Sequence, residues 1–159
     1  MSKRFFGVIA ITVGISAAAG CTVFPNPEPP RVMDLAWPGL ERSPAERIPY
    51  VLRVDTPYAS EPFNSTLILA KPTEWEFQSY PEVRWRDTAP MMLRDAVIVS
   101  LRRNGGFTDV IAETSPAEAN LTLVSELSAF HTEEPAGYPT IKVELHAQVI
   151  DARTRGTVC

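Results

Sequence analysis

The sequence contains little cysteine, little histidine and no excess of positive charge. Two cysteines and two histidines occur among 159 residues, and 19 acidic residues outnumber 15 lysines and arginines. A framework of several disulfides within the chain is therefore excluded. No basic stripe marks a nucleic-acid-binding protein. Nucleotide-binding loops, serine-hydrolase elbows and zinc-protease motifs are also absent, so no enzyme class is indicated.

The apolar run near the N-terminus is too short to cross a bilayer as a helix. It comprises residues 5–19, which is 15 residues, whereas a spanning helix needs about 20. Lys3 and Arg4 precede the run, and it ends in small residues up to Gly20. Because this basic, apolar and small-residue order is that of a secretory signal, residues 1–20 are predicted to be a signal peptide.

Cys21 follows the small residues directly, and Ala19-Gly20-Cys21 resembles the lipobox of bacterial lipoproteins. That pattern implies cleavage before the cysteine, a diacylglycerol on its thiol and an acylated amino group. Two or more acyl chains hold a protein stably in a membrane. Cys21 is therefore interpreted as a lipidation site; the alternatives are a secreted protein cut near Ala19 and an uncleaved anchor. Thr22, where an aspartate would suggest retention, favours the periplasmic face of the outer membrane of a Gram-negative bacterium.

Proline is concentrated just after Cys21. Residues 22–49 hold seven of the 15 prolines, and proline disrupts helices and interior strands. Residues 21–49 are therefore predicted to be a lipidated cysteine and a proline-rich tether. Several apolar residues indicate that part of the tether docks on the domain or on a partner: Val32, Met33, Leu35, Trp37 and Leu40. Without residues 1–20, which carry two basic and no acidic residues, the net charge is −6.

Residues 50–159 have the patterning of one α+β domain. Alternating or apolar segments predict strands at 51–55, 66–70, 75–80, 107–112, 120–130 and 140–151. In the last strand Ile141, Val143, Leu145, Ala147 and Val149 are expected to face the core, with Lys142, Glu144, His146 and Gln148 outside. The two final strands predict an antiparallel hairpin with one solvent-exposed face. The expected fold is a single domain, a mainly antiparallel sheet with helix 88–104 packed on one face.

The helix at 88–104 has clear signals at both ends. Asp87 or Thr88 suits the N-cap and Pro90 the first turn. Asn104-Gly105-Gly106 provides a left-handed stop. Between them the apolar residues recur at steps of three and four, which predicts one buried stripe: Met92, Leu93, Ala96, Val97, Ser100 and Leu101.

The stretch Tyr80–Leu93 is YPEVRWRDTAPMML, in which tyrosine, tryptophan and proline lead into the helix. Together with the Asn-Gly-Gly-Phe turn, the late turn at 151–156 and the lipobox, it resembles the ABC-type transport auxiliary lipoproteins (the PqiC/YmbA-like family, that of paraquat-inducible protein C). The resemblance runs from about residue 50 to the end. It implies a non-catalytic accessory lipoprotein that works beside an MCE-domain (MlaD-like) protein, a permease and an ATPase. Such systems move lipids or other apolar compounds between envelope membranes. By analogy with ring-forming MCE proteins, a homo-oligomer is a further expectation.

The end of the chain departs from that family. Its members usually continue past the late turn with a strand and a C-terminal helix, whereas this chain stops at Cys159. Residues 157–159 resemble the first three residues of such a strand. The domain at 50–159 is therefore expected to be C-terminally incomplete, with part of its apolar face uncovered and prone to aggregation.

Few residues suggest chemistry. His146 and Glu144 share the outward face of a strand without a third convergent group, and His131 is expected in a solvated hairpin loop, so no metal, cofactor or catalytic role is predicted.

Tyr80, Arg84, Trp85 and Arg86 are candidate partner-binding residues, because tryptophan and arginine are enriched in interface hot spots. The alternative, favoured for Trp85, is that its ring packs over the start of the helix. An outer-membrane assembly lipoprotein that binds or chaperones a β-barrel is the second functional hypothesis, and a lipid-anchored hydrolase is a weaker third.

Overall fold

A computed structural model of the chain describes residues 28–36, 47–134 and 137–159. The predicted signal peptide, Cys21 and most of the tether lie outside the described residues. Within the described part, no helix has both the length and the apolar character needed to cross a membrane.

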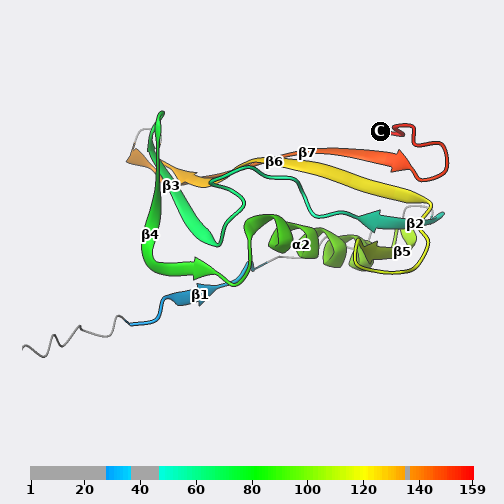
Figure 1. Cartoon of the computed structure of the whole chain (residues 1–159), viewed down its shortest axis with the longest axis horizontal. Helices are drawn as coiled ribbons and strands as arrows, with labels where there is room; N and C mark the ends of the chain where they lie inside the picture. The colour runs from blue at the N-terminus through cyan, green and yellow to red at the C-terminus, as the bar shows by residue number, and fades with distance from the viewer. Residues whose placement is uncertain (1–27, 37–46, 135–136) are drawn as a thin grey trace, which may run out of the picture.

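The described residues form seven strands and one helix (Figure 1). In chain order they are β1 (Arg31–Met33), β2 (Ile48–Val54), β3 (Leu67–Thr73), β4 (Glu76–Trp85), α2 (Ala89–Asn104), β5 (Phe107–Ala112), β6 (Leu121–Glu133) and β7 (Thr140–Asp151). The predicted strands and helix are all confirmed, with shifted ends. β1 lies in the segment predicted to be tether and was not expected as a strand.

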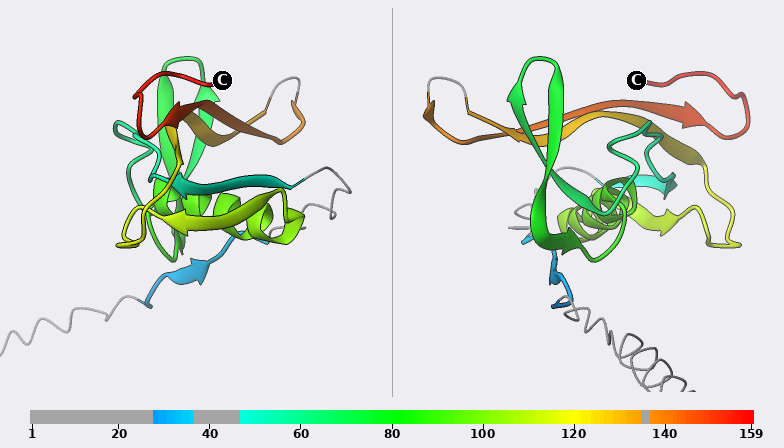
Figure 2. Two further views of the ribbon diagram at one scale, coloured as in Figure 1. Left: turned by 90° about the vertical axis from the view of Figure 1, so that its right-hand side faces the viewer. Right: turned by 60° about the vertical axis from the view of Figure 1, so that its left-hand side comes forward.

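β6 is the centre of the sheet. One of its edges pairs antiparallel with β7 along its whole length. Its other edge pairs in parallel with β2 at Leu121–Leu123, then with Tyr58 at Glu126, and finally with β3 at Thr132–Glu133. β5 extends the sheet beyond β2, while β4 and then β1 extend it beyond β3. Because β2 and β3 leave β6 at opposite ends, the sheet curls (Figures 1 and 2).

The expectation of a mainly antiparallel sheet with the helix on one face was wrong. Four strand pairs are parallel, β1–β4, β2–β5, β2–β6 and β3–β6, and only the hairpins β3–β4 and β6–β7 are antiparallel. The helix lies inside the curl, between the β6–β7 ladder, the β3–β4 arm and the β2–β5 arm (Figure 1). It therefore contacts several parts of one curved, mixed sheet rather than a single flat face.

The helix begins and ends where the sequence indicates. Thr88 is the N-cap with an extended backbone, Pro90 lies in the first turn, and Gly105 caps the C-terminus with a φ of 76°. The Gly105 N–H donates to the carbonyl of Leu101, and glycine adopts this left-handed conformation without steric cost. Arg102 and Arg103 in the last turn suit the negative end of the helix dipole.

Two apolar clusters lie along the helix. Its first turns pack into a cluster of Ala59, Phe63, Leu69, Ala89, Leu93, Leu127 and Phe130 between β3 and β6. Its later turns pack through Ile98 into a cluster of Leu52, Val54, Val110 and Leu121 between β2, β5 and β6. The predicted stripe is thus largely confirmed, because Met92, Leu93, Ala96 and Ser100 are buried.

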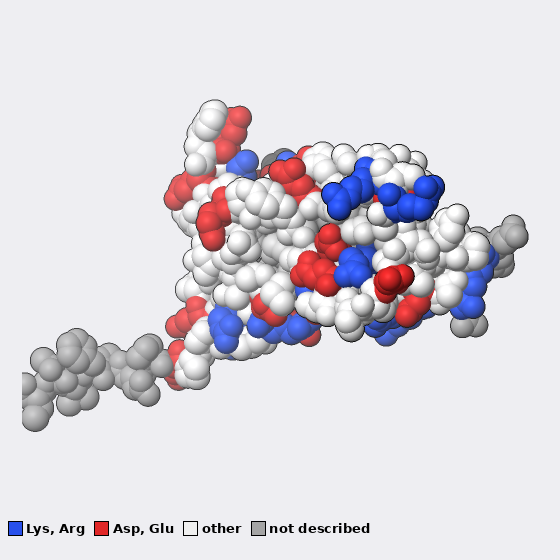
Figure 3. Space-filling view, turned by 45° about the vertical axis from the view of Figure 1, so that its right-hand side comes forward, with Lys and Arg blue, Asp and Glu red and all other residues white. Residues whose placement is uncertain are grey.

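Two sets of apolar side chains that lie in predicted strands are exposed. The β3–β4 hairpin rises from the body (Figures 1 and 3), leaving Trp75 at its tip 88% exposed. On β7, Ile141 is 76% and Val143 50% exposed. Along most of its length β7 is bonded to β6 alone, and it projects with β6 beyond the helix. Among the described elements none covers this end of its apolar row.

The chain turns back after β7 over the predicted turn at 151–156. The Asp151 side chain accepts hydrogen bonds from the N–H groups of Arg153 and Thr154. Thr157 then pairs antiparallel with Ile150, and the N–H of Val149 donates to the carbonyl of Cys159 at 2.8 Å. The last three described residues therefore pair with the outer edge of β7.

β4 bends at Glu82, which has a φ of 59°. β4 pairs with β3 on both sides of the bend, and after it residues 83–85 also pair with β1. Exchanging Glu82 for valine is expected to lower the free energy of unfolding by about 1 kcal/mol, because a β-branched side chain tolerates a left-handed backbone poorly. Urea titration of both chains measures this. The control Glu76→Val, at an exposed position of the same strand, is expected to cost nothing, and an equal loss in both variants would contradict the explanation.

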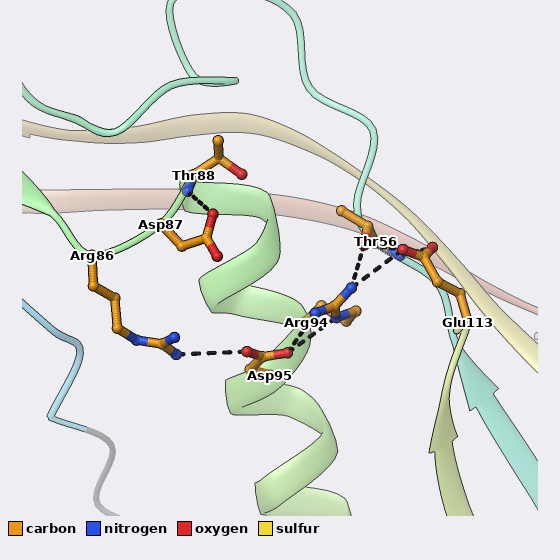
Figure 4. A network of polar contacts seen from close by, with 7 residues as sticks. All are labelled: Thr56, Arg86, Asp87, Thr88, Arg94, Asp95 and Glu113. Carbon is orange, nitrogen blue, oxygen red and sulfur yellow. Dashed lines mark hydrogen bonds and ion pairs between the residues drawn. The ribbon is translucent and has the colours of Figure 1, made fainter. Parts of the chain in front are cut away.

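A polar network joins the helix to the ends of β2 and β5 (Figure 4). The Arg94 side chain, 11% exposed, donates through Nη1 to Thr56 Oγ1 at 3.0 Å and to Glu113 Oε1 at 3.2 Å. Its Nη2 donates to Asp95 Oδ1 at 2.8 Å. Glu113 also accepts from the hydroxyl and the N–H of Thr56, at 2.6 and 2.9 Å. The network fixes where the helix lies relative to the two strand ends.

This network predicts a loss of stability in acid. The Thr56 hydrogen bonds, followed by Arg94, hold the pKa of Glu113 below its ordinary value. The corresponding stabilisation is present above the ordinary glutamate pKa of about 4.3 and is lost as the pH falls through the lowered folded-state pKa. Burial and the nearby Glu113 raise the pKa of Asp55, an effect of opposite sign. Urea midpoints measured from pH 7 to pH 3 should therefore fall less in Glu113→Gln than in the parent; parallel curves would exclude Glu113 as a source.

Candidate functional site

The structure disperses the four candidate partner-binding residues. The Tyr80 hydroxyl lies 2.9 Å from Thr132 Oγ1 on β6, and its side chain is partly exposed. Arg84 is exposed and donates only to the neighbouring carbonyl of Trp85, at 3.4 Å. Trp85 turns inward and Arg86 turns towards the segment after β1. The four residues thus have different surroundings, and a partner-binding role for them stays a prediction.

Trp85 packs at the start of the helix, as the favoured alternative proposed. Its ring lies 5.7 Å from that of Phe130, between centroids, and it borders the cluster that contains Leu93 and Leu69. Its Nε1 is buried and has no hydrogen-bond partner among the described residues.

Arg86 holds part of the predicted tether against the domain. Its Nε lies 2.8 Å from Asp34 Oδ1, and its N–H donates to the carbonyl of Met33 at 2.9 Å. β1 pairs in parallel with the end of β4. The hydrogen bond from Arg86, and then that from the Leu35 N–H, lower the pKa of Asp34. Docking of part of the tether on the domain, one of the two expectations for its apolar residues, is therefore confirmed for residues 31–35.

Removing this contact should loosen β1 without unfolding the domain. We expect Arg86→Ala to speed hydrogen–deuterium exchange of a peptide covering residues 28–36 by about tenfold, while global stability falls by less than about 1 kcal/mol, because the ion pair is exposed. Mass spectrometry of peptides measures the exchange. Arg84→Ala, two residues away and unconnected to Asp34, is the control; equal exchange in the two variants would show that Arg86 does not hold the tether.

An apolar pocket of about 330 Å³ opens beside Trp85. Leu35, from the docked tether, and Trp85 line it. Ile68 and Leu69 of β3 and Leu93 of the helix also line it. The pocket is thus assembled from segments that lie far apart in the sequence.

The ladder of β6 and β7 completes the pocket. Phe130, His131 and Thr132 of β6 line it together with Ile141 and Val143 of β7. No acidic or basic side chain other than His131 is among the lining residues. Because the two β7 side chains are exposed at the rim, the pocket is open to solvent through an apolar mouth.

His131 is buried, so its predicted place in a solvated loop was wrong. It lies on β6, which continues to Glu133, and its side chain is 3% exposed. The ring stacks 5.9 Å from Phe63 and meets Phe77 edge-on at 5.2 Å. Nε2 lies 2.9 Å from Glu133 Oε1, while Nδ1 is buried and has no partner in the described part of the chain.

His146 lies where it was predicted, on the outward face of β7. Its side chain is 69% exposed and its Nε2 lies 3.4 Å from Glu144 Oε1. Across residues 28–36, 47–134 and 137–159 there is no group of three histidine, cysteine or acidic side chains that could hold a metal ion.

Sequence reasoning did not identify the pocket or the Arg94 network. The sequence analysis assigned the pocket residues to unrelated roles, with Leu35 in the tether and His131 in a solvated loop, and nothing in their spacing joins Leu35 to Val143. For the network, the available signal was the pair Arg94-Asp95 beside an otherwise apolar helix stripe, but its partners Thr56 and Glu113 are distant in sequence.

Comparison with solved structures identifies the fold. The chain is similar to the crystal structure of a Xanthomonas campestris protein described as belonging to the DUF330 family, with a TM-score of 0.73 and 22% identity over 80% of this chain and 72% of that one. The chain has a DUF330-type fold. A second crystal structure, of a protein described as uncharacterized, matches with a TM-score of 0.51 and 12% identity over 81% of this chain and 84% of the other. No protein-family model and no curated protein matches the sequence.

Proposed function

We propose that this DUF330-like chain is a non-catalytic accessory lipoprotein of an ABC/MCE-type system that moves lipids or other apolar compounds between the inner and outer membranes. The observation that carries the proposal is the DUF330-type fold over most of the chain. DUF330 corresponds to the PqiC/YmbA-like family that the Tyr80–Leu93 stretch and the lipobox also resemble. In this proposal Cys21 anchors the chain at the periplasmic face of the outer membrane.

The arrangement of the domain supports an accessory role. Part of the proline-rich tether is held on the domain by Arg86 and Asp34, so a lipid anchor at Cys21 would be joined to the folded part through a docked segment. Acidic and basic residues are interspersed on the face seen in Figure 3.

Co-purification tests the partner. The full chain, tagged after Cys159 and extracted with its membrane from cells that produce it, is expected to retain an MCE-domain protein together with its permease and ATPase. Retention of a β-barrel protein instead would favour the assembly hypothesis and overturn the transport proposal.

Metabolic labelling tests the anchor separately. Radioactive palmitate is expected to label the full chain and to be lost in Cys21→Ser, because that substitution removes the thiol and the lipobox cysteine. Label that persists in the variant would exclude Cys21 as the lipidation site.

A further inference from the structure

We propose that the apolar pocket beside Trp85 binds the alkyl chain of a membrane lipid. The inference deepens the proposed function, on which it rests for the source of the ligand, because it assigns an apolar cargo to a site on this domain. The pocket itself is defined by the structure alone.

The size of the pocket suits a chain-shaped ligand. Its volume is about 330 Å³, at the lower end of the range of about 300–1,000 Å³ for small-molecule sites. An engineered apolar protein cavity of about 150 Å³ stays dry and binds benzene. A pocket about twice that volume has room for several more carbon atoms than a single ring, but not for a whole phospholipid.

The walls favour an apolar ligand. The lining is aliphatic and aromatic except for His131 and Thr132; Nε2 of His131 bonds Glu133, and Oγ1 of Thr132 bonds Tyr80. Two buried ring nitrogens of lining residues, Nδ1 of His131 and Nε1 of Trp85, have no partner among the described residues. A bound water needs two to four polar partners, and these two nitrogens are the most that the walls leave for it. An alkyl chain needs none, and its transfer from water into such a pocket is favourable.

The mouth explains how a lipid chain enters and where its headgroup stays. Val143 and Ile141 stand exposed at the rim on β7, so the apolar surface continues from the pocket to solvent. The headgroup remains outside in water while the chain lies against Trp85 and Phe130. Leu35 forms part of the wall, which places the docked tether in contact with the occupant.

Quenching of Trp85 fluorescence tests this inference. The full chain, with its anchor in lipid nanodiscs, carries Trp37→Phe and Trp75→Phe, so that Trp85 is its single tryptophan. A fatty acid brominated along its chain quenches tryptophan only on contact. We expect a saturable fall in Trp85 fluorescence that excess palmitate reverses. A control protein that retains Trp75 as its single tryptophan, the exposed residue at the hairpin tip, should show no saturable quenching.

Two substitutions to phenylalanine, one at the rim of the pocket and one outside it, provide a matched pair. Val143→Phe, at a half-exposed position that tolerates a larger side chain, should fill the mouth and raise the half-saturating concentration of the brominated fatty acid by about tenfold or more. Val99→Phe, on the exposed face of the helix and outside the pocket, should leave it unchanged. Trp85 fluorescence that does not respond in the folded chain, or an equal shift in both variants, would overturn the proposal.

The two proposals fail in different ways. Quenching without co-purification of an MCE-domain protein would keep the lipid pocket and remove the assigned transport system. Co-purification without quenching would keep the system and exclude this pocket as a lipid site. If Val143→Phe abolished co-purification while the parent showed no quenching, the rim would be a protein contact and the lipid proposal would be wrong.

Discussion

Replacing Leu127 with alanine is expected to lower the free energy of unfolding by about 2–5 kcal/mol. Leu127 is 2% exposed and lies near the middle of β6, where the helix and the β3 arm both meet the central strand. Its side chain contributes to the cluster that contains Phe63, Leu93 and Phe130. Truncation removes buried methyl groups and leaves a cavity that a strand bonded on both edges cannot collapse to fill.

The size of this loss is large compared with the stability of a single domain, which is about 5–15 kcal/mol. Urea unfolding followed by circular dichroism measures it, with an unchanged slope showing that the denatured state is not altered. Leu67→Ala is the matched control, because Leu67 is 44% exposed on β3 and its truncation should cost less than about 1 kcal/mol. Equal losses at the two positions would show that Leu127 is not central to the packing.

The elements that could be predicted are those whose signals lie within a few residues of one another. The helix was placed within one residue of its observed start because Thr88, Pro90 and Gly105 mark its ends. The hairpin of the last two strands followed from a pair of alternating segments joined by a short polar stretch. Such local patterns depend on backbone conformation and on which face is apolar, and both are encoded over 5 to 15 residues.

Strand order could not be predicted in this way. The parallel pairs of β2 with β5 and with β6 bring Val54 beside Ala112 and Leu123. The chain between β2 and β5 includes the helix and two strands, and β5 itself adds a third strand before β6. Nothing in the alternation of β2 distinguishes a parallel from an antiparallel neighbour. The antiparallel expectation extended the rule for hairpins to pairs that are not hairpins.

The candidate site was predicted in part. The stretch around Trp85 was recognised as unusual, and the inward packing of its ring was the favoured interpretation. His131 was misplaced because the charged residues Glu133 and Glu134 suggested that the strand had already ended, whereas β6 continues to Glu133. The pocket could not be inferred, because its volume arises from the curl of the sheet and not from any one segment.

Arg94 is the second position where a single change should have a large effect. Arg94→Met keeps most of the aliphatic stem but removes the guanidinium that bonds Thr56, Asp95 and Glu113. The two carboxylates then lose their shared cation. Breaking a fully buried pair from one side costs about 3–5 kcal/mol; here the acids are 39–41% exposed, so water compensates part of the loss. We expect destabilisation of about 2 kcal/mol, measured by urea unfolding at pH 7.

Two further variants separate the network from the general effect of losing a charge. Arg103→Met removes an exposed arginine from the last turn of the same helix and should cost less than about 1 kcal/mol. In a double-mutant cycle, Arg94→Met combined with Glu113→Gln should be less destabilising than the sum of the two single changes by about 1 kcal/mol, because residues in one hydrogen-bond network do not act additively. Strict additivity would mean that Arg94 stabilises the fold through its packing alone, and that the strand ends at Thr56 and Glu113 are held to the helix by other contacts.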